Sequence, residues 1–504
     1  MLKPKEQPEA VVENEEICLP PSASHLLESM RALGYSFEAA LADLIDNSIS
    51  AEASRIEVHF SPYDSPFVAI LDNGWGMSPS EATAAMRHGS RDPRSSRDRK
   101  DLGRFGLGLK TASLSQCRRL TVVSLKQGIL SARRWDLDHV ARRHDWMLLQ
   151  LGDEEISNLP LVADLRANGH GTIVLWQKFD LLEAAEQSLE RALGDRMDLA
   201  RDHLSLVFHR FLSPPPGTRA VAISINRNPL AAVDPFLTSN RATQALPIED
   251  FILEGERVIV SPFILPHLSK LNAADLLLAG GENGLRRNQG FYIYRNRRLI
   301  SWGSWFRLVR QEELTKLARV QVDISNQLDH LWQLDIKKST TYPPIGLRDA
   351  LKQIINRITE GSRRVYTYRG RKAADAITHT WERTVERDGF VCYSINRKHP
   401  LVASVEASIG ESELPLFEAL LRTFEQTLPF DALYADLASE LRPAARGTEQ
   451  DVRKALLDLA QQLLDALGGR ETPEGQRFLS ALPSIEPFSS AVEEARAIAR
   501  TLNA

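Results

Sequence analysis

Residues 103–111 read GRFGLGLKT and run into a helical pattern that continues through Ser115. Glycines leave backbone amides free to approach an anion at the start of a helix, and Lys110 adds positive charge. The spacing excludes a Walker A loop, which needs four residues between its first glycine and its Gly-Lys-Ser/Thr. A dinucleotide fingerprint fits poorly, because no clear strand leads into the glycines. The stretch therefore indicates a phosphate site, with a glycine hinge as the alternative.

Three further short stretches lie in order around this one. Residues 43–48 read DLIDNS, residues 72–77 read DNGWGM, and Gly171-Thr172 precedes an apolar strand. Asp43 and Asn47 are four residues apart and share one face of a helix, where a carboxylate can orient water and an amide oxygen can bind Mg²⁺. Asp72, at a strand end, can accept a hydrogen bond from an adenine amino group. Taken singly, the three also fit a polar helix face, a turn and a strand start.

Together, the patterns Asp-x-x-x-Asn, Asp-x-Gly-x-Gly, Gly-x-x-Gly-x-Gly-x-Lys and Gly-Thr resemble the four nucleotide-site motifs of the gyrase, heat-shock chaperone, histidine kinase and MutL (GHKL) superfamily. The resemblance covers about residues 25–210. It implies a Bergerat-type α/β sandwich that holds ATP and Mg²⁺ between its helices and one sheet face. The resemblance makes Asp43 the predicted general base for ATP hydrolysis. Hydrolytic members usually have glutamate at this position, so Asp46 is the alternative general base.

The same resemblance assigns roles to individual residues. It implies that Asn47 binds Mg²⁺, that Asp72 binds adenine with support from Thr172, and that residues 87–108 form a lid over ATP. The further nucleotide-binding residues that it implies are Asp46, Gly74, Gly76, Met77, Gly103, Gly106, Leu107, Gly108, Leu109, Lys110 and Thr111.

The remainder of the chain predicts an α+β protein with several parts. Residues 1–20 are a polar arm, and residues 21–213 are the ATP-binding domain. Pro214-Pro215-Pro216-Gly217 marks a boundary. Residues 214–345 are predicted to form a second αβ domain, whose first strand is expected at 220–225. Residues 346–504 are predicted to be mainly helical.

The second domain resembles the transducer domain of MORC and MutL-like proteins, and bacterial MORC-like ATPases above all. Residues 290–300, GFYIYRNRRLI, and residues 335–339, DIKKS, carry this resemblance. It implies that Lys338 reaches the γ-phosphate of ATP. Strand alternation favours Lys338 over Lys337, which stays open as the alternative. The resemblance to these proteins also implies a nucleotide-dependent homodimer in which the N-terminal arms are exchanged.

Composition bears on the partner and on the compartment. The net charge is −4, so any nucleic-acid contact must come from local patches. Residues 283–310 contain seven arginines and no acid, interleaved with aromatic residues, and the segments 87–119 and 361–372 are also basic. These patches favour a clamp acting on DNA, for genome maintenance or defence against foreign DNA. The alternative is a protein-remodelling or scaffold protein whose C-terminal region binds a polypeptide. Three dispersed cysteines and the lack of a long apolar run indicate a cytoplasmic protein without a membrane span.

Overall fold

A computed structural model shows two units, residues 1–362 and residues 363–504. The structure describes residues 19, 21–32, 34–88, 102, 108–185, 188–267, 270–280, 284–312, 315–332, 342–367, 377–385, 391–430, 433 and 449–503. Of the predicted arm, only Leu19 is described. Gly103, Gly106, Leu107, Lys337 and Lys338 lie outside the described residues, as does most of the predicted lid.

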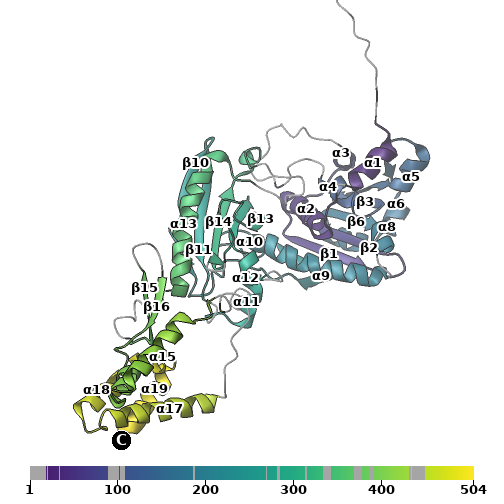
Figure 1. Cartoon of the computed structure of the whole chain (residues 1–504). Helices are drawn as coiled ribbons and strands as arrows, with labels where there is room; N and C mark the ends of the chain where they lie inside the picture. Colours follow the sequence, from purple (N-terminus) through teal and green to yellow (C-terminus); the bar gives the residue numbers. More distant parts are fainter. Residues whose placement is uncertain are drawn as a thin grey trace, which may run out of the picture. The chain divides into compact units, whose positions relative to one another are not determined.

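The first unit begins with a mixed sheet in the order β5-β4-β3-β6-β2-β1-β7-β8. The strands are β1 (Arg55–Ser61), β2 (Phe67–Asp72), β3 (Arg119–Lys126), β4 (Ile129–Asp136), β5 (Leu149–Gln150), β6 (Gly171–Gln177), β7 (Ala222–Ile225) and β8 (Asn228–Pro229). The helices are α1 (Ala23–Arg31), α2 (Phe37–Ser50), α3 (Pro79–Ala85), α4 (Gly108–Leu114), α5 (Leu137–Arg143), α6 (Asp153–Ser157), α7 (Val162–Asn168), α8 (Asp180–Ala185), α9 (Leu189–Val207) and α10 (His209–Leu212). Figure 1 shows α2 and α9 lying along this sheet.

Alternating side chains give the sheet two buried faces, as the strand period requires. Ile56, Val58 and Ile70 point into a core shared with α2 and α9. Leu71 and Val123 point to the opposite face of the sheet. There they pack with other apolar residues against α6 and α7. The first face is the one on which the nucleotide motifs lie. The prediction of an α/β sandwich is confirmed.

Strand β7 corrects one expectation. Residues 220–225 were predicted to open the second domain, but β7 pairs in parallel with β1, with Ile56 opposite Ile223. The nucleotide-domain sheet therefore continues past Pro214–Gly217. The proline-rich stretch forms a connection that leads from α10 back to the same sheet.

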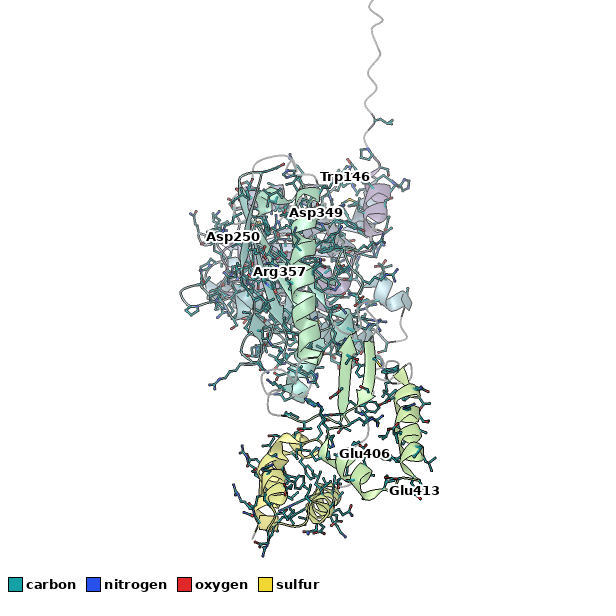
Figure 2. The ribbon with its side chains drawn as sticks, turned by 60° about the vertical axis from the view of Figure 1, so that its left-hand side comes forward. Trp146, Asp250, Asp349, Arg357, Glu406 and Glu413 are labelled. Atoms are coloured by element: carbon teal, nitrogen blue, oxygen red, sulfur yellow. The ribbon has the colours of Figure 1, made fainter. Side chains whose placement is uncertain are left out.

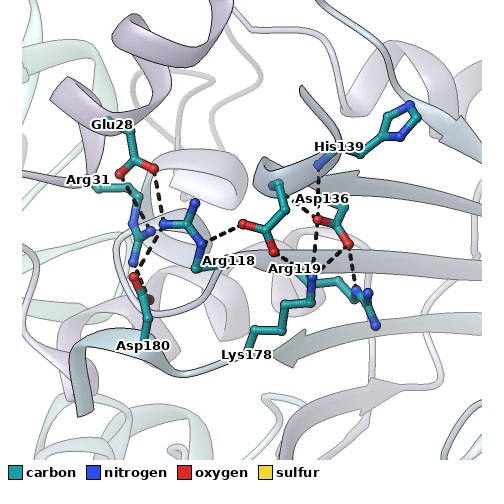
Figure 3. A network of polar contacts seen from close by, with 9 residues as sticks. Glu28, Arg31, Arg118, Arg119, Asp136, His139, Lys178 and Asp180 are labelled. Carbon is teal, nitrogen blue, oxygen red and sulfur yellow. Dashed lines mark hydrogen bonds and ion pairs between the residues drawn. The ribbon is translucent and has the colours of Figure 1, made fainter. Parts of the chain in front are cut away.

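A network of partly exposed ion pairs fastens α1 to the sheet (Figure 3). Arg118, just before β3, donates to Glu28 of α1 at 3.1 Å, to Asp138 at 2.9 Å and to Asp180 at 3.3 Å. Arg31 of α1 pairs with the same Asp180 at 2.5 Å. Single exposed pairs of this kind contribute little to the free energy of unfolding. Here the shared partners fix where α1 lies beside α5 and β3.

A second sheet follows in the order β10-β11-β14-β12-β13, with β9 pairing β11. Its elements are β9 (Gln244–Ala245), β10 (Glu249–Leu253), β11 (Glu256–Ile264), α11 (Ala273–Gly280), α12 (Gly284–Arg287), β12 (Gly290–Arg295), β13 (Arg298–Ser304), β14 (Ala318–Ile324) and the 3-10 turn η4 (Asn326–Leu328). Helix α13 (Ile345–Thr367) carries a row of buried leucines and isoleucines, and its Arg357 pairs with Glu249 of β10. Figure 2 shows α13 in front of this sheet.

The second unit is mainly helical, as predicted, and also holds a hairpin. Its elements are β15 (Trp381–Val385), β16 (Val391–Ile395), α14 (Pro400–Ser408), α15 (Leu414–Gln426), α17 (Glu449–Ala466), α18 (Pro473–Ala481), η5 (Leu482–Ser484), η6 (Phe488–Ser490) and α19 (Val492–Asn503). Apolar residues of α17, α18 and α19 form its core, with Leu482 of η5 and Phe488 of η6. None of the helices in the described part of the chain has the length and apolar character to cross a membrane.

Candidate functional site

Helix α2 holds the acidic residues of the candidate site. Ser36 caps its first turn by accepting from Ala39 N–H, and the apolar face of the helix packs into the core. Asp43 and Asp46 are 9% and 1% exposed, whereas Asn47 is exposed. Asn47, whose amide was predicted to bind Mg²⁺, is thus the solvent-exposed residue among these three. No group of three or more metal-ligand side chains occurs in the described residues.

Asp43 lies against the start of α4. A Cβ added to Gly108 would lie 3.7 Å from Asp43 Oδ2, so the carboxylate faces the backbone at the end of the glycine-rich stretch. Tyr35 donates its hydroxyl to the same oxygen at 3.2 Å. The structure therefore brings together the first and third motifs, with the predicted base beside the predicted phosphate loop.

Asp72 lies at the end of β2, where α2 crosses it. Its carboxylate accepts from Ser48 Oγ at 2.9 Å and from Gly74 N–H at 2.9 Å. Burial raises the pKa of Asp72, and these hydrogen bonds, together with one from Thr172, partly offset that effect. Ser48, which the sequence did not single out, is thus a link between the first motif and the second.

Thr172 stands opposite Asp72 in the β2–β6 pair. Its hydroxyl lies 3.0 Å from Ser124 Oγ, and Ser124 Oγ also accepts from Met77 N–H at 2.7 Å. Ser124 of β3 therefore joins the second motif to the fourth. No sequence signal marked it, because a lone serine in a strand has many structural uses.

Two glycines in these motifs occupy positions that a side chain would disrupt. Gly76 has φ of +69°, and a Cβ there would lie 2.2 Å from Leu125 O. Gly171 has φ of +131°, and its Cβ would lie 2.0 Å from Asp72 O. The requirement for glycine therefore comes from close approach to the backbone of Leu125 at Gly76 and of Asp72 at Gly171, besides the positive φ.

Gly171→Ala is expected to destabilise the nucleotide domain and displace Asp72, because the new methyl collides with backbone atoms that cannot move aside. Strain and collision together should cost about 3 kcal/mol of the free energy of unfolding. The urea transition, followed by the fluorescence of the buried Trp176, measures this loss. Gly169→Ala is the matched control: its φ is +78° but nothing lies within 4 Å, so about 1 kcal/mol is expected. Equal losses in both variants would show that the approach to Asp72 O is unimportant.

Lys110 is placed differently from the simple expectation. Its ammonium donates to Ala85 O, at the end of α3, at 2.9 Å, and the side chain is 2% exposed. Burial lowers the pKa of Lys110 to about 8 and, with the charge of Lys110 as a smaller cause, that of His88 to about 4. The carbonyl at a helix C-terminus suits this cation. Gly108, Leu109 and Thr111 stand in the same first turns of α4.

The arginine-rich, aromatic stretch 283–310 does not form the predicted stacking surface. Phe291, Tyr292, Tyr294 and Trp305 are all buried. Arg295 and Arg298 are buried too, and Arg297 is half-buried. The exposed arginines of the stretch are Arg286, Arg287, Arg307 and Arg310. Arg298 therefore does not belong to an exposed basic patch, because strand β13 turns that side chain toward Asp46 of α2.

A pocket of about 350 Å³ opens beside Asp43. Residues of α2, α9 and β13 line it, including His203, Arg298 and Trp302, together with Tyr35 from the segment before α2. Burial, followed by the nearby positive charge of Arg298, lowers the pKa of His203 to about 4. His203 is therefore neutral at pH 7. The positive charge beside Asp43 in this pocket is that of Arg298.

Known proteins resemble the same part of the chain. Residues 35–172 match the family described as histidine kinase-, DNA gyrase B-, and HSP90-like ATPase. The ATPase morc-1 of Caenorhabditis elegans is 33% identical over 95 residues, 19% of this chain and 11% of that protein. Human ATPase MORC2 is 33% identical over 79 residues, 15% and 8% of the two chains. The mismatch repair endonuclease pms1 of Dictyostelium discoideum is 27% identical over 106 residues, 21% and 10%.

The chain therefore carries an ATP-binding domain of the GHKL superfamily. Within that superfamily the domain is MORC-like. The chain covers about a tenth of the length of these relatives, so the likeness concerns the nucleotide domain.

Proposed function

We propose that this protein is a Mg²⁺-dependent ATPase that closes as a nucleotide-gated dimeric clamp on DNA. One observation carries the enzymatic part: α2 carries the first motif and contacts the second and third, while Thr172 of the fourth stands opposite Asp72. Its Asp43 faces Gly108 of the phosphate loop, and its Ser48 donates to Asp72, the predicted adenine residue. Asn47, exposed on the same helix, is the proposed Mg²⁺ ligand, with water and phosphate oxygens completing the coordination.

The chemical role proposed for Asp43 is to hold the attacking water and accept its proton. A general base must stand within hydrogen-bond reach of that water, directly in front of the terminal phosphate. Asp46 is the weaker candidate, because its carboxylate is already engaged by Arg298 at 2.7 Å. The Arg298 Nε lies within hydrogen-bond distance of both Asp46 oxygens, so both already have a partner. Lys338 is proposed to contact the γ-phosphate on the strength of the transducer resemblance.

The DNA clamp is proposed from one relative and from exposed positive charge. A relative named as a mismatch repair endonuclease suggests nucleic acid as the partner, and the four exposed arginines Arg286, Arg287, Arg307 and Arg310 are available for phosphate contacts. The MORC-like character of the domain suggests nucleotide-dependent pairing of two copies. Residues 1–20 are proposed as the exchanged arms, and a cytoplasmic location is proposed with them.

A polypeptide partner is the second candidate, and helix α15 favours it. Leu416, Leu420 and Phe424 follow one another at intervals of four and are 75%, 48% and 51% exposed. Such a stripe on a helix is typical of a surface that another protein covers. The two candidates differ in whether nucleic acid affects ATP turnover.

DNA is expected to stimulate ATP hydrolysis at low salt and to lose this effect at high salt, because the contacts are with phosphates. Replacing Arg286, Arg287 and Arg307 with glutamine should lower the slope of log affinity against log salt by roughly one unit per lost contact. Filter binding across a salt series measures the slope. No binding or stimulation by any DNA would reject the clamp on DNA and leave the polypeptide partner.

Clamp closure is tested separately by sedimentation. With a non-hydrolysable ATP analogue the protein is expected to sediment as a dimer, and without nucleotide as a monomer. Deleting residues 1–20 should weaken the dimer, because ordering a polar arm costs entropy that only a partner surface offsets. A dimer that forms equally well without nucleotide would contradict the clamp.

A further inference from the structure

The turn between β12 and β13 reaches the nucleotide domain. It is a two-residue hairpin: Arg295 pairs with Arg298 across the strands, and Asn296 and Arg297 have φ of +48° and +73°. Two positive φ values are typical of a type I′ turn, in which glycine usually follows asparagine. Arginine in that second position is strained. The Arg297 guanidinium is held by Arg210 O and lies 4.6 Å from the centre of the Phe211 ring, both on α10.

Arg298, directly after the turn, contacts the acids of α2. Its Nε lies 2.7 Å from Asp46 Oδ2, and its terminal nitrogen lies 3.8 Å from Asp43 Oδ1. The three side chains are 6%, 2% and 10% exposed. Burying two carboxylates one helical turn apart is unfavourable without a counter-charge, because their repulsion is poorly screened there. Arg298, from the second domain, supplies that charge.

Arg295, directly before the turn, contacts the other side of the site. Its guanidinium holds both oxygens of Asp329, at 2.7 and 2.8 Å, and donates to Leu102 O at 2.8 Å. The N–H of Leu102 donates to Ser50 Oγ, at the end of α2, at 3.3 Å. Leu102 immediately precedes the glycine-rich stretch 103–111. One short hairpin thus touches both the helix that carries the proposed base and the residue that leads into the phosphate loop.

We propose that the hairpin 295–298 couples the second domain to ATP hydrolysis, with Arg298 as the positioning residue for Asp43 and Asp46 and with Arg295 holding Leu102. The inference rests on the proposed ATPase activity. A shift of the second domain moves both arginines together, because they flank the same two-residue turn. It therefore alters the aim of the base and the position of Leu102 in one step.

Simple adhesion between the domains is the competing explanation, and other contacts already provide it. His209 of α10 lies 2.7 Å from the Tyr294 hydroxyl, and Arg210 pairs with Asp323 of β14. Beside Arg298 the interface is open, because that side chain lines the 350 Å³ pocket with Asp43. An arginine that served packing alone would not be expected to border a pocket next to the proposed base.

The test compares Arg298→Met, Asp46→Asn and the double variant in the full chain. Arg298→Met is expected to lower kcat for ATP about 10–100-fold, the range seen when a residue that orients a functional group is removed, and to change ADP affinity less than about threefold. It should also lower the melting temperature, because two buried carboxylates lose their counter-charge. The double variant should regain most of the melting temperature while kcat stays low. Arg298→Lys should give an intermediate kcat.

Arg257→Met is the matched control, because it breaks an exposed arginine–aspartate pair in the same domain, at 2.6 Å from Asp250. It should change neither kcat nor the melting temperature. The inference is overturned if Arg298→Met keeps the parent kcat, or if the double variant regains kcat together with stability. If the parent itself hydrolyses no ATP, the proposed function fails, and the inference fails with it. An active parent with equally active arginine variants rejects the inference alone.

Discussion

Asp43→Ala is expected to leave ATP bound while slowing its hydrolysis by about 10²–10⁴-fold, the usual effect of removing a general base. The carboxylate faces Gly108 at the phosphate loop and accepts from Tyr35, whereas Asp72 accepts from Ser48 farther along α2. Single-turnover hydrolysis with prebound ATP separates the chemical step from binding. Titration calorimetry with a non-hydrolysable analogue checks that affinity is retained.

Three neighbouring variants sharpen this result. Asp43→Glu keeps the carboxylate and adopts the residue usual in hydrolytic members of the superfamily, so it should retain activity. Asn47→Ala should abolish Mg²⁺-dependent binding without removing the base. Asp46→Ala should act mainly through Arg298, which loses its partner at 2.7 Å. Normal hydrolysis by Asp43→Ala, combined with inactivity of Asp46→Ala, would reverse the assignment of the base.

The grouping of the candidate-site residues was predictable from sequence because each motif is local. Asp43 and Asn47 lie one helical turn apart, and Asp72, Gly74 and Gly76 belong to one strand end, so short spacing determines their relative placement. The fold class followed from the resemblance that those stretches carry. Gly171 was noted only as part of the Gly-Thr motif, in which the predicted site residue was Thr172. The structure adds that the φ of Gly171 and its approach to Asp72 O exclude a side chain.

The residues that sequence analysis missed act over long sequence separations. Arg298 and Asp46 are 252 positions apart, and Arg295 and Leu102 are 193 apart. Local charge could not distinguish a buried coupling arginine from a DNA-binding one, because both occur in arginine-rich, aromatic stretches. Strand β7 was placed in the wrong sheet for a similar reason: its parallel partner β1 lies far away in the sequence. Pairing between distant segments is decided by tertiary packing, which one sequence does not display.

Asp72→Asn is expected to lower ATP affinity about 10–100-fold and to change which nucleotide base the site prefers. The carboxylate accepts from Gly74 N–H, from Ser48 Oγ and from Thr172, and we expect its remaining acceptor capacity to serve an adenine amino group. Asparagine can keep the bond to Gly74 through its oxygen. Ser48 can adapt by donating to Leu44 O, which lies 3.4 Å away, and by accepting from the new amide. The fold should therefore survive, which makes the binding result interpretable.

In the variant, the amide nitrogen faces the adenine amino group, so that two donors meet in a buried site. A mismatch of this kind costs roughly 1–3 kcal/mol, which corresponds to the expected loss of affinity. Inosine triphosphate carries a carbonyl where ATP carries the amino group, so the variant should bind it better than the parent does. Titration calorimetry of both nucleotides against both proteins measures the exchange. Ser48→Ala removes one hydrogen bond from Asp72 and leaves the carboxylate. It should weaken ATP binding without reversing the preference for ATP over inosine triphosphate. If Asp72→Asn binds both nucleotides as the parent does, Asp72 does not contact the base.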